Sequence, residues 1–496
     1  MGHPFRVHDT LRRSILSFEP HRPGHVGIYV CGMTVYDHAH VGHARAMVVF
    51  DALVRTLRHR GWEVTYVRNY TDVDDKIIRR ARERGEAPLA LAQRYVDAFR
   101  EDMHALGLLP PDAEPRVTEH IPEIVAMIEA LLARGHAYVV PSGDVFFAVS
   151  TSPGYGSLSR QRADHLDASA DADTGKRDRR DFALWKAARP GEPRWDAPWG
   201  PGRPGWHIEC SAMAQATLGS ALDIHGGGLD LVFPHHENEI AQSECVHGAP
   251  YAGHWMHNGL LVTGGGAKIA RSEGNGRTIR EVLARVPAEA LRFAYLRAHY
   301  RSPLAWDDDA VTDALAQLAR LYAAIEIAGT LRGEGDPDRA AAELGEDART
   351  ALALARSFPV RVHEALEDDL DTPRALMLAL ELGRAIHRLA ASKGAPARGG
   401  PIAQVAVDAL RVLRDTLGLL GSSPEAFDAE IRAKVLPSRG LDEASIESTV
   451  RGRDAARARR AWAEADAIRV ELESRGIDLR DTPEGTRWRV RIVGPV

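Results

Sequence analysis

The strongest constraint on the fold is a strand, a loop, a helix and a second strand that follow one another between residues 25 and 67. Residues 25–30 (HVGIYV) predict a short buried strand, and residues 62–67 predict another. Residues 44–60 between them carry apolar side chains at helical spacing, namely Met47, Phe50, Leu53 and Leu57. Such a β–α–β unit builds a parallel sheet, which binds ligands at the carboxyl ends of its strands. We therefore expect an α/β fold, with its site near the loop at residues 31–43.

An inserted subdomain of different composition interrupts this sheet, which resumes at residues 254–262. Residues 122–137 predict a helix, and a pair of strands follows it, the second at residues 145–149. Residues 161–180 are charged, alanine-rich and almost free of large apolar side chains, which predicts a mobile loop. Residues 185–206 are rich in Pro, Gly and Trp, which predicts a rigid, non-helical return to the main sheet.

The C-terminal part, after residue 280, is mostly helical. Residues 366–389 are amphipathic, and the segments 329–337 and 393–401 have the composition of linkers between helices. Residues 461–475 predict a further helix, followed by two short strands that end near Trp488. We expect this last part to be a small separate module.

Charge and cysteine content limit the class of protein. The net charge is −6, which alone does not indicate a nucleic-acid partner. Five arginines after Thr449 form either a local basic surface or a solvated helix face: Arg451, Arg453, Arg457, Arg459 and Arg460. Three cysteines are too few for a disulfide framework, and neither a signal peptide nor a run of roughly 20 apolar residues is evident. We expect a cytoplasmic protein with no membrane partner.

His40, Val41, Gly42 and His43 stand where the first strand has ended and the helix begins. A helix N-terminus offers unpaired N–H groups and a partial positive charge, which suit phosphate. Gly42 lets a flat base approach the backbone, and the two histidines can donate hydrogen bonds from one face to a developing phosphoryl charge. The same tetrapeptide also occurs incidentally, so its spacing alone leaves both interpretations open.

A second set of residues has the chemistry of a zinc site. The candidates are Cys31, Cys210, His235 and Glu239. His235 and Glu239 stand at i and i+4, on one face of a helix, and thiolate, imidazole and carboxylate groups all bind zinc. The alternative is two buried cysteines that behave as small apolar residues. We expect His236 and Glu237 to point elsewhere on the same helix.

Three more segments are candidates for the site. Lys268 and Arg271 lie in a glycine-rich stretch that either closes over a triphosphate or is simply an exposed basic loop. Residues 72–76 (DVDDK) either bind a ligand amine or cap a helix. Residues 223–228 (DIHGGG) predict a strand followed by a glycine turn.

Taken together, these segments resemble the cysteinyl-tRNA synthetases, a family of class I aminoacyl-tRNA synthetases, over nearly the whole chain. Residues 29–45 (YVCGMTVYDHAHVGHAR) are similar to the first signature of that family, with HVGH in place of HIGH. The further matches, in the order of the family, are YVRNYTDVDDKI (66–77), RPGWHIECSAM (203–213), DIHGGGLDLVFPHHENEIAQSE (223–244), DDLDTPRAL (368–376) and ADAIRVELESRGIDLRDTPEGTRW (465–488). Runs of this length in the correct order are highly specific.

The resemblance implies a Rossmann-type α/β catalytic domain with an inserted subdomain, then a helical bundle and a small C-terminal anticodon-binding module. It implies a monomer that activates L-cysteine with ATP to cysteinyl-adenylate and transfers the cysteine to tRNA(Cys). It also implies Mg2+ with the ATP and one zinc ion per chain. Zinc binds the cysteine thiolate far better than a serine hydroxyl, so no editing domain is required.

The resemblance implies three groups of site residues. The zinc ligands are Cys31, Cys210, His235 and Glu239. The ATP-binding residues are His40, Gly42, His43, Lys268 and Arg271, and all of these except Gly42 are also catalytic. The residues that bind the amino acid are Gly32, Thr34, Thr71, Trp206 and His225.

The second signature departs from the KMSKS of the family. The residues in its place are Lys268, Ile269, Ala270, Arg271 and Ser272. Arg271 keeps the charge of the second lysine but changes its geometry and hydration. Glu273 adds a negative charge where the family commonly has an apolar residue. We expect activity to survive because the cation is retained.

The resemblance also gives the expected domain boundaries. Residues 1–115 and 203–250 form the two halves of the catalytic domain, and residues 116–202 form the connective insertion. The later boundaries are 251–318 for a stem-contact region with the KMSKS-like loop, 319–432 for the helical bundle and 433–496 for the anticodon-binding module.

Two other functions compete with this one. A sibling family joins cysteine to an amino-sugar in mycothiol synthesis and shares the zinc site, but it is shorter and resembles this chain poorly after the helical region. A degenerate paralogue that binds RNA or zinc without catalysis would explain the altered second signature, whereas the intact His40, His43 and zinc-ligand candidates argue against it. Cys245 is expected to be a buried structural thiol.

Overall fold

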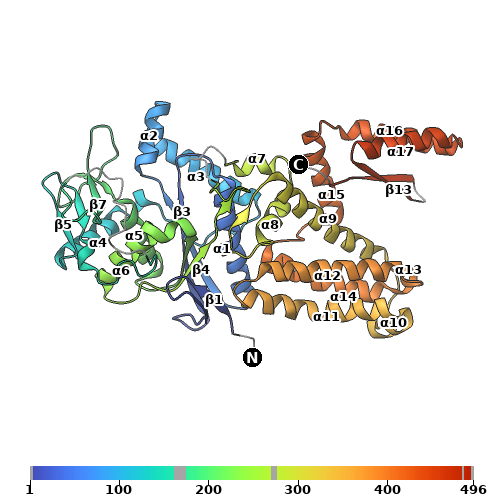
Figure 1. Ribbon diagram of the computed structural model, residues 1–496, viewed down its shortest axis with the longest axis horizontal. Coiled ribbons are helices and arrows are strands. Elements are labelled where there is room, and N and C mark those ends of the chain that lie inside the picture. Colours follow the sequence, from blue (N-terminus) through green and yellow to red (C-terminus); the bar gives the residue numbers. More distant parts are fainter. Residues whose placement is uncertain (1–3, 161–174, 270–275, 483–484, 493–496) are drawn as a thin grey trace.

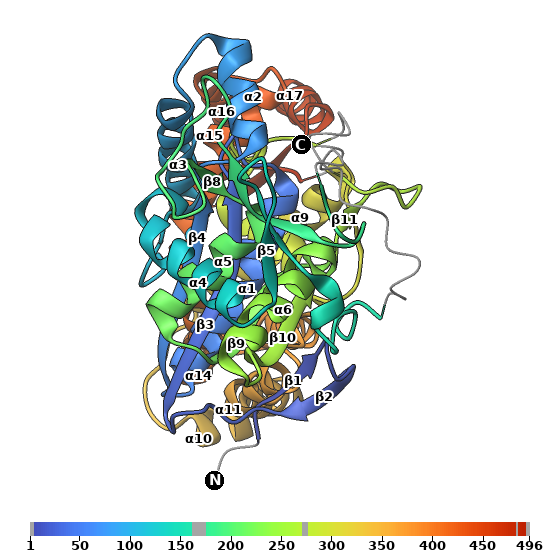
Figure 2. The same ribbon diagram turned by 90° about the vertical axis from the view of Figure 1, so that its left-hand side faces the viewer.

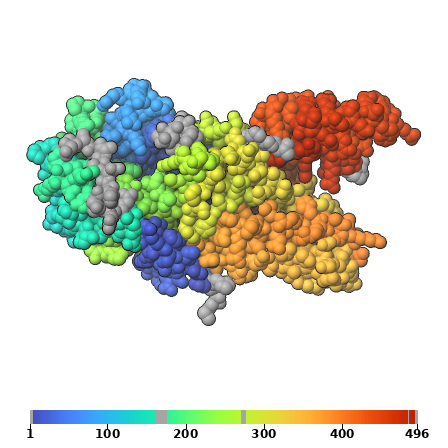
Figure 3. Space-filling model, viewed as in Figure 1, coloured from blue at the N-terminus to red at the C-terminus, as the bar shows by residue number. Residues whose placement is uncertain are grey.

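The computed structural model describes residues 4–160, 175–269, 276–482 and 485–492. The molecule is elongated, with the inserted subdomain at one end and two arms at the other (Figure 1). One arm is a bundle of helices, and the other is the C-terminal module, which projects beside the bundle as a separate body (Figure 3). No helix in these ranges combines the length and the apolar character needed to cross a membrane.

A parallel sheet lies between the inserted subdomain and the arms, as the sequence predicted. Its four strands, in spatial order, are β10 (Ala252–Asn258), β9 (Leu222–Gly228), β3 (His25–Thr34) and β4 (Glu63–Thr71). All of their pairings are parallel. Three helices connect these strands. The helix α1 (Val41–His59) follows β3, α5 (Trp206–Leu218) precedes β9, and α6 (Glu237–His247) follows β9. Because β3 lies between strands from the two halves of the chain, both halves bring residues to one edge of the sheet.

The first strand and the first helix are both longer than the sequence predicted, so the loop between them is shorter. β3 continues to Thr34 because Met33 and Thr34 still pair with β4. α1 begins at Val41, directly after its N-cap His40, whose side chain accepts a hydrogen bond from the Gly42 N–H. The HVGH segment therefore starts the helix rather than preceding it.

The inserted subdomain combines helices with a small antiparallel sheet, and Figure 2 turns it toward the viewer. Its helices are α4 (Ile121–Ala133) and the short 3-10 turns η1 (Val117–Glu119) and η2 (Val149–Thr151). The helices α2 (Asp75–Arg84) and α3 (Pro88–Ala105) precede it, and α3 packs against the main core. The sheet has the order β5 (Ala137–Val139), β6 (Val145–Phe147), β7 (Phe182–Ala187) and β8 (Gly202–Pro204). The predicted rigid return at 185–206 thus contains strand residues. Of the predicted loop at 161–180, residues 161–174 lie outside the described ranges.

Helices form most of the remaining chain, and a short parallel pair, β11 (Leu261–Val262) with β12 (Leu304–Ala305), stands at its start. The helices from here to the end of the bundle are α7 (Ile279–Leu283), α8 (Ala288–Leu296), α9 (Asp308–Thr330), α10 (Pro337–Leu344), α11 (Glu346–Glu367), α12 (Thr372–Ala391), α13 (Ala395–Arg398) and α14 (Gly400–Leu417). The linker predicted at 329–337 is present, whereas the one at 393–401 contains the short α13. The C-terminal elements are α15 (Pro424–Ser438), α16 (Glu443–Ala458), α17 (Trp462–Ser474) and the hairpin of β13 (Ile477–Thr482) and β14 (Gly485–Val490).

The arginine-rich segment of the C-terminal module is largely neutralised by ion pairs. Arg453 is buried and pairs with Asp481, which also pairs with Arg457. Arg451 and Arg459 pair with carboxylates in neighbouring turns of the same module. Four of these five arginines therefore have a carboxylate partner within the module, which weakens the interpretation as an open basic surface.

One buried ion pair joins three parts of the molecule. Arg292 on α8 donates to Asp51 Oδ2 on α1 at 2.5 Å and to the Leu417 carbonyl at the end of α14 at 2.6 Å. The side chains of Asp51 and Arg292 are only 3% and 1% exposed. The helix that starts at HVGH is thereby fixed to α8 and to the bundle.

We expect the substitution Asp51→Ala to lower the free energy of unfolding by about 3–5 kcal/mol, because it leaves a buried guanidinium without its carboxylate. Replacing both residues, as Asp51→Leu with Arg292→Met, should cost less because no buried charge remains. Urea unfolding followed by tryptophan fluorescence measures both. Asp338→Ala is the matched control, since Asp338 forms a pair of similar length with Arg356 on the surface, and it should change the free energy of unfolding far less than Asp51→Ala. Equal losses in Asp51→Ala and the control would contradict the role given to the buried pair.

Candidate functional site

The site lies where the carboxyl ends of the central strands meet. In the observed register, Tyr29 on β3 pairs with His225 on β9, and Thr34 on β3 pairs with Thr71 on β4. This places Cys31, between Tyr29 and Thr34, beside residues of both neighbouring strands. The crevice at such a point is the usual ligand site of an open parallel sheet.

The four predicted zinc ligands come together beside β3. Their ligand atoms all lie within 4.8 Å of one another, and all four residues are buried: Cys31, Cys210, His235 and Glu239. They come from β3, from α5, from the π-helical turn η5 (Val232–His236) and from the first turn of α6. His235 Nε2 is 3.2 Å from Glu239 Oε1, so the expected i, i+4 contact is present even though His235 precedes the regular helix. Two thiols, an imidazole and a carboxylate form a donor set suited to zinc.

A second, overlapping group was not predicted. It consists of Cys31, His225, His236 and Glu239. His236 Nε2 lies 3.3 Å from Cys31 Sγ, so the expectation that His236 points elsewhere is wrong. The cause is local, because the π-helical turn changes the angle between successive side chains and brings both histidines of the HHE sequence to one side. Glu237 does point elsewhere: its carboxylate accepts the N–H groups of Gly156 and Ser159, both at 2.8 Å.

Hydrogen bonding in this cluster favours a bound cation. His225 Nδ1 donates to the Tyr29 carbonyl at 3.1 Å, so a neutral ring has no proton on Nε2. His225 Nε2 nevertheless lies 3.0 Å from Glu239 Oε2. Two acceptors at that distance need a proton or a cation to compensate them. The cluster therefore fits a metal ion that uses the Glu239 carboxylate.

The ionisation of the thiols and of Glu239 agrees with this fit. Burial raises the pKa of the Cys31 thiol well above its usual value. For Cys210, the hydrogen bond with Cys31 lowers the thiol pKa, whereas burial raises it. The net result is a raised pKa. Burial alone would raise the pKa of Glu239, but His225 and His235 bring it below its usual value. The pKa values of both thiols are raised and the carboxylate beside them is anionic, so a bound cation is needed for the thiols to ionise.

An outer shell of aromatic rings encloses the cluster. Trp206 stacks on His235 with ring centroids 4.3 Å apart, and His207 Nδ1 is 3.0 Å from His235 Nδ1. On the other side, His236 Nδ1 lies 2.7 Å from His257 Nε2. Burial lowers the pKa of His207, His235 and His257 to about 3, so these rings are neutral at neutral pH. Sequence reasoning missed His207 and His257, although His207 stands inside the GWHIEC match.

The two histidines of HVGH form a capping box at the start of α1. His40 Nδ1 accepts the Gly42 N–H at 3.0 Å, and His43 Nδ1 accepts the His40 N–H at 3.2 Å. The rings stack with centroids 3.8 Å apart. Because each Nδ1 is an acceptor, each neutral ring carries its proton on Nε2 and can donate it to a ligand. A side chain at position 42 would meet the His40 ring at 2.8 Å, so only glycine fits there.

The described part of the second signature lies against the first. The Ile269 N–H donates to the Leu261 carbonyl at 2.9 Å, and Val262 bridges Lys268, which closes a hairpin. Lys268 Nζ donates to Asp230 Oδ2 at 2.6 Å. Burial lowers the pKa of His43 well below its usual value, with His40, Lys268 and Lys76 adding to the effect. Arg271 and the rest of residues 270–275 lie outside the described ranges.

A cavity of about 840 Å3 opens between the sheet edge and the inserted subdomain. Thr34 and Trp206 line it from the central part, and Phe146, Phe182 and Arg180 line it from the insertion. This space is far larger than a cysteine side chain, and His40, Gly42, His43 and Lys268 do not line it. Of the predicted amino-acid pocket, Thr34 and Trp206 thus face the cavity, whereas His225 lies in the buried cluster.

The remaining predicted pocket residues lie at the strand ends. Thr71 Oγ1 donates to Glu209 Oε2 at 3.3 Å, and burial raises the pKa of Glu209 well above its usual value. The Gly32 N–H donates to Asn69 Oδ1 at 2.8 Å, and a side chain at position 32 would overlap the Asn69 carbonyl. In the 72–76 segment, Asp74 accepts the Lys76 N–H and caps α2, which confirms the capping interpretation for that residue.

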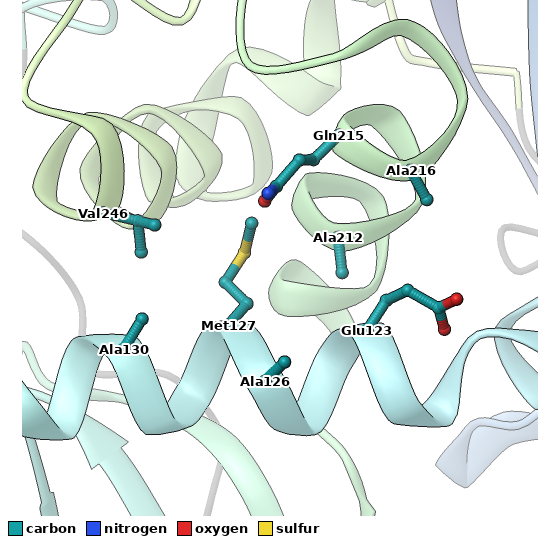
Figure 4. A pocket seen from close by; sticks show the side chains of 8 residues that line it. All are labelled: Glu123, Ala126, Met127, Ala130, Ala212, Gln215, Ala216 and Val246. Carbon is teal, nitrogen blue, oxygen red and sulfur yellow. The ribbon is translucent and has the colours of Figure 1, made fainter.

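A smaller cavity of about 260 Å3 lies apart from these residues, between α4 and α5 (Figure 4). Its lining is Glu123, Ala126, Met127, Ala130, Ala212, Gln215, Ala216 and Val246. None of the predicted site residues lines it. Cys245, next to Val246, is half-buried rather than fully buried as expected.

Comparison with known families gives two matches along the chain. Residues 17–316 match the model of the class I (C) tRNA synthetase catalytic domain. Residues 442–489 match the model of the cysteinyl-tRNA ligase anticodon binding domain. The first match alone covers more than half of the chain.

Similar proteins agree with these matches. The cysteine–tRNA ligase of Alkalilimnicola ehrlichii is 52% identical over 485 residues, covering 97% of this chain and 99% of the relative. That of Methylococcus capsulatus is 49% identical over 486 residues, covering 98% and 99%. Among solved structures, the methionyl-tRNA synthetase of Mycobacterium tuberculosis with methionyl-adenylate has a TM-score of 0.61 at 15% identity, covering 85% of this chain and 94% of that one. The structural likeness supports the fold.

The buried histidines predict a steep loss of stability in acid. Below the usual pKa of 6.5, the unfolded chain takes up a proton on His257, whereas the folded chain does not until about pH 3. Stability is therefore complete above pH 6.5 and falls as the pH falls, by roughly 2–3 kcal/mol per such histidine between pH 6.5 and 4.5. We expect the melting temperature of His257→Gln to depend less on pH in this window than that of the wild type. His104→Gln, at an exposed position, should leave the pH dependence unchanged, and identical curves for all three proteins would refute the assignment.

Proposed function

The chain belongs to the class I cysteinyl-tRNA synthetases, and from that premise we propose how its residues carry out the cysteine–tRNA ligase reaction. The observation that carries the proposal is the buried group of thiols, imidazoles and Glu239 next to a cavity at the carboxyl edge of the sheet. The alternative of an amino-sugar acceptor has less support, because residues 442–489 match an anticodon-binding domain.

The resident metal of this cluster is proposed to be zinc, held by Cys31, Cys210, His235 and Glu239. When bound, zinc supplies a thiophilic Lewis acid that takes the thiolate of cysteine and not the hydroxyl of serine. The chain contributes a dry, tightly packed surrounding, since Trp206 covers His235 and Tyr251 donates to Glu239 Oε2 at 3.3 Å. A site of this kind can reject serine by roughly 10⁴–10⁵ without editing.

ATP is proposed to bind, with Mg2+, at the N-terminus of α1. Gly42 leaves room for the nucleotide, and His40 and His43 donate Nε2–H to phosphate oxygens as charge develops on them. The low pKa of His43 keeps that ring a neutral donor. When ATP binds, Lys268 leaves its ion pair with Asp230 and binds the triphosphate instead. Arg271 supplies a second positive charge to the triphosphate.

The reaction then proceeds in two steps. The cysteine carboxylate attacks the α-phosphorus of ATP, the bond to the β-phosphate oxygen breaks, and pyrophosphate leaves with cysteinyl-adenylate formed. A terminal ribose hydroxyl of the tRNA next attacks the activated carbonyl carbon, loses its proton and releases AMP. No covalent bond to the enzyme forms, so catalysis rests on positioning and on charge stabilisation.

The domain boundaries expected from the sequence are retained as part of the proposal, except that β10, within 251–318, belongs to the central sheet. The C-terminal module lies at the far end of the molecule from the insertion (Figure 1). An L-shaped tRNA can therefore contact the module with its anticodon and the cavity with its 3′ end. We propose that one chain acts as a monomer in the cytoplasm.

Aminoacylation with measured metal content tests the function. We expect the purified protein to charge total tRNA with cysteine, to leave serine uncharged, and to contain about one zinc per chain. Adenylate formation without tRNA charging would instead favour a small-molecule acceptor. If the protein forms no adenylate and charges no tRNA, the proposed enzymatic function is ruled out.

The metal assignment has its own test in two cysteine variants. We expect Cys210→Ser to lose zinc and cysteine-dependent ATP–pyrophosphate exchange, because a hydroxyl is a poor zinc ligand. Cys245→Ser is the matched control, since the half-buried Cys245 lies outside the cluster, and it should keep both. Zinc retained at full stoichiometry in Cys210→Ser would exclude that residue as a ligand.

The second signature is tested by Lys268→Ala and Arg271→Ala. Each should slow adenylate formation about 10²-fold or more, because a cation that stabilises transferring phosphates is lost. Presteady-state quench-flow with cysteine and ATP measures this step directly. Arg271→Lys should recover most of the rate, since the charge is kept. An unchanged rate in Arg271→Ala would remove that residue from the mechanism.

A further inference from the structure

We propose that Arg45 is a positioning residue that fixes the hairpin carrying Lys268 against the start of α1, so that Lys268 and His43 reach the same triphosphate. Arg45 stands two residues after His43, on the helix that HVGH begins. The inference rests on the proposed function, because it assigns a role within that ATP site. It adds a residue that touches neither substrate nor metal.

The Arg45 guanidinium joins two backbone segments that are far apart in the sequence. One terminal nitrogen donates to the Leu260 carbonyl at 2.8 Å. The other donates to the Ser302 carbonyl at 2.5 Å and to the Tyr300 carbonyl at 3.4 Å. Leu260 directly precedes β11, and Ser302 lies two residues before β12, so Arg45 holds the starts of both strands of the short parallel pair.

The buried side chain of Arg45 bonds only to backbone carbonyls among the hydrogen bonds described here. Arg45 is fully buried, at 0% exposure, and all of its hydrogen bonds described here go to carbonyl oxygens rather than to a carboxylate. Burial lowers the pKa of Arg45 to about 10, which still leaves the group charged at neutral pH. A buried cation without a carboxylate is costly, and backbone carbonyls in a fixed geometry compensate it best through the planar fork of an arginine.

The two segments are in close backbone contact. The Gly259 N–H donates to the Tyr300 carbonyl at 2.8 Å, and a side chain at Gly259 would overlap the backbone of residues 301–302. The geometry at the start of β11 is therefore set from both sides, by the guanidinium and by the glycine contact.

This geometry is transmitted to Lys268 through a short hairpin. β11 starts the hairpin at Leu261, which accepts the Ile269 N–H at 2.9 Å, and Val262 bridges Lys268. The carbonyl of Ile269 in turn lies 3.6 Å from where a side chain of Gly42 would start. The second signature is thus packed onto the first, and Arg45 lies at the point where the two join.

The consequence concerns the rate of activation rather than the binding of cysteine. A shift of about 1 Å between groups that share a transition state can lower a rate about 10²-fold. Loosening the hairpin should therefore slow adenylate formation, whereas the metal cluster and the later transfer step stay as they are. A merely structural arginine would instead change stability and all steps together.

The test is Arg45→Lys, which keeps the charge but loses the planar fork. We expect kcat of cysteine-dependent ATP–pyrophosphate exchange to fall about 10- to 100-fold, with KM for cysteine, zinc content and transfer from preformed adenylate within about twofold of the wild type. In a Lys268→Ala background, Arg45→Lys should cause less than about a twofold further loss, because the group that it positions is already absent.

Two further variants keep the test decisive. Gly259→Ala disturbs the same contact without changing charge and should reproduce the Arg45→Lys pattern; it also serves if Arg45→Lys does not fold. Arg292→Lys is the matched control, since Arg292 is another buried arginine bonded to a backbone carbonyl, that of Leu417. It should lower the melting temperature and, if it slows exchange, do so independently of Lys268→Ala.

The outcomes separate this inference from the function on which it rests. A wild-type protein without cysteine-dependent exchange would remove the proposed function before any variant is compared. An active wild type in which Arg45→Lys exchanges normally, or in which its defect multiplies fully with that of Lys268→Ala, would overturn the role of Arg45 and leave the function intact.

Discussion

The site depends above all on the parallel register of β3 with its two neighbours. The pairing of β3 with β4 is irregular between Val30 and Met33, so the direction of the Cys31 side chain is set at this irregularity. The observed register sets Tyr29 against His225 and Thr34 against Thr71, which brings the two halves of the chain to one edge. Helices then carry Cys210, His235 and Glu239 to that edge.

The second constraint is the cost of burying so many polar groups beside that edge. Desolvation lowers the pKa of His235, His236 and His257, and the Glu239 carboxylate and two thiols are buried among these rings. A metal ion would compensate the carboxylate and the thiols at once, and its binding energy would then become part of the folding energy.

The sequence predicts those parts of the molecule that periodicity and long motifs encode. The central strands, the helices and the order of the signatures follow from local pattern, and the four zinc-ligand candidates do lie together. His236 was misplaced because a π-helical turn breaks the regular angle on which the helix argument relied. His257 and Arg45 were missed because their roles depend on tertiary contacts with residues distant in sequence, which no spacing reveals.

The same distinction bears on the altered second signature. Its side chains differ from the family pattern, yet the backbone that presents Lys268 is set elsewhere, by carbonyls that bind Arg45 and by the close contact at Gly259. When the frame is fixed by groups outside the loop, a substitution within the loop changes the chemistry of one contact and not the position of the others. An arginine at position 271 can then replace a lysine while Lys268 keeps its relation to His43. On this proposal, the signature can vary because the backbone that presents Lys268 is fixed by residues outside the loop.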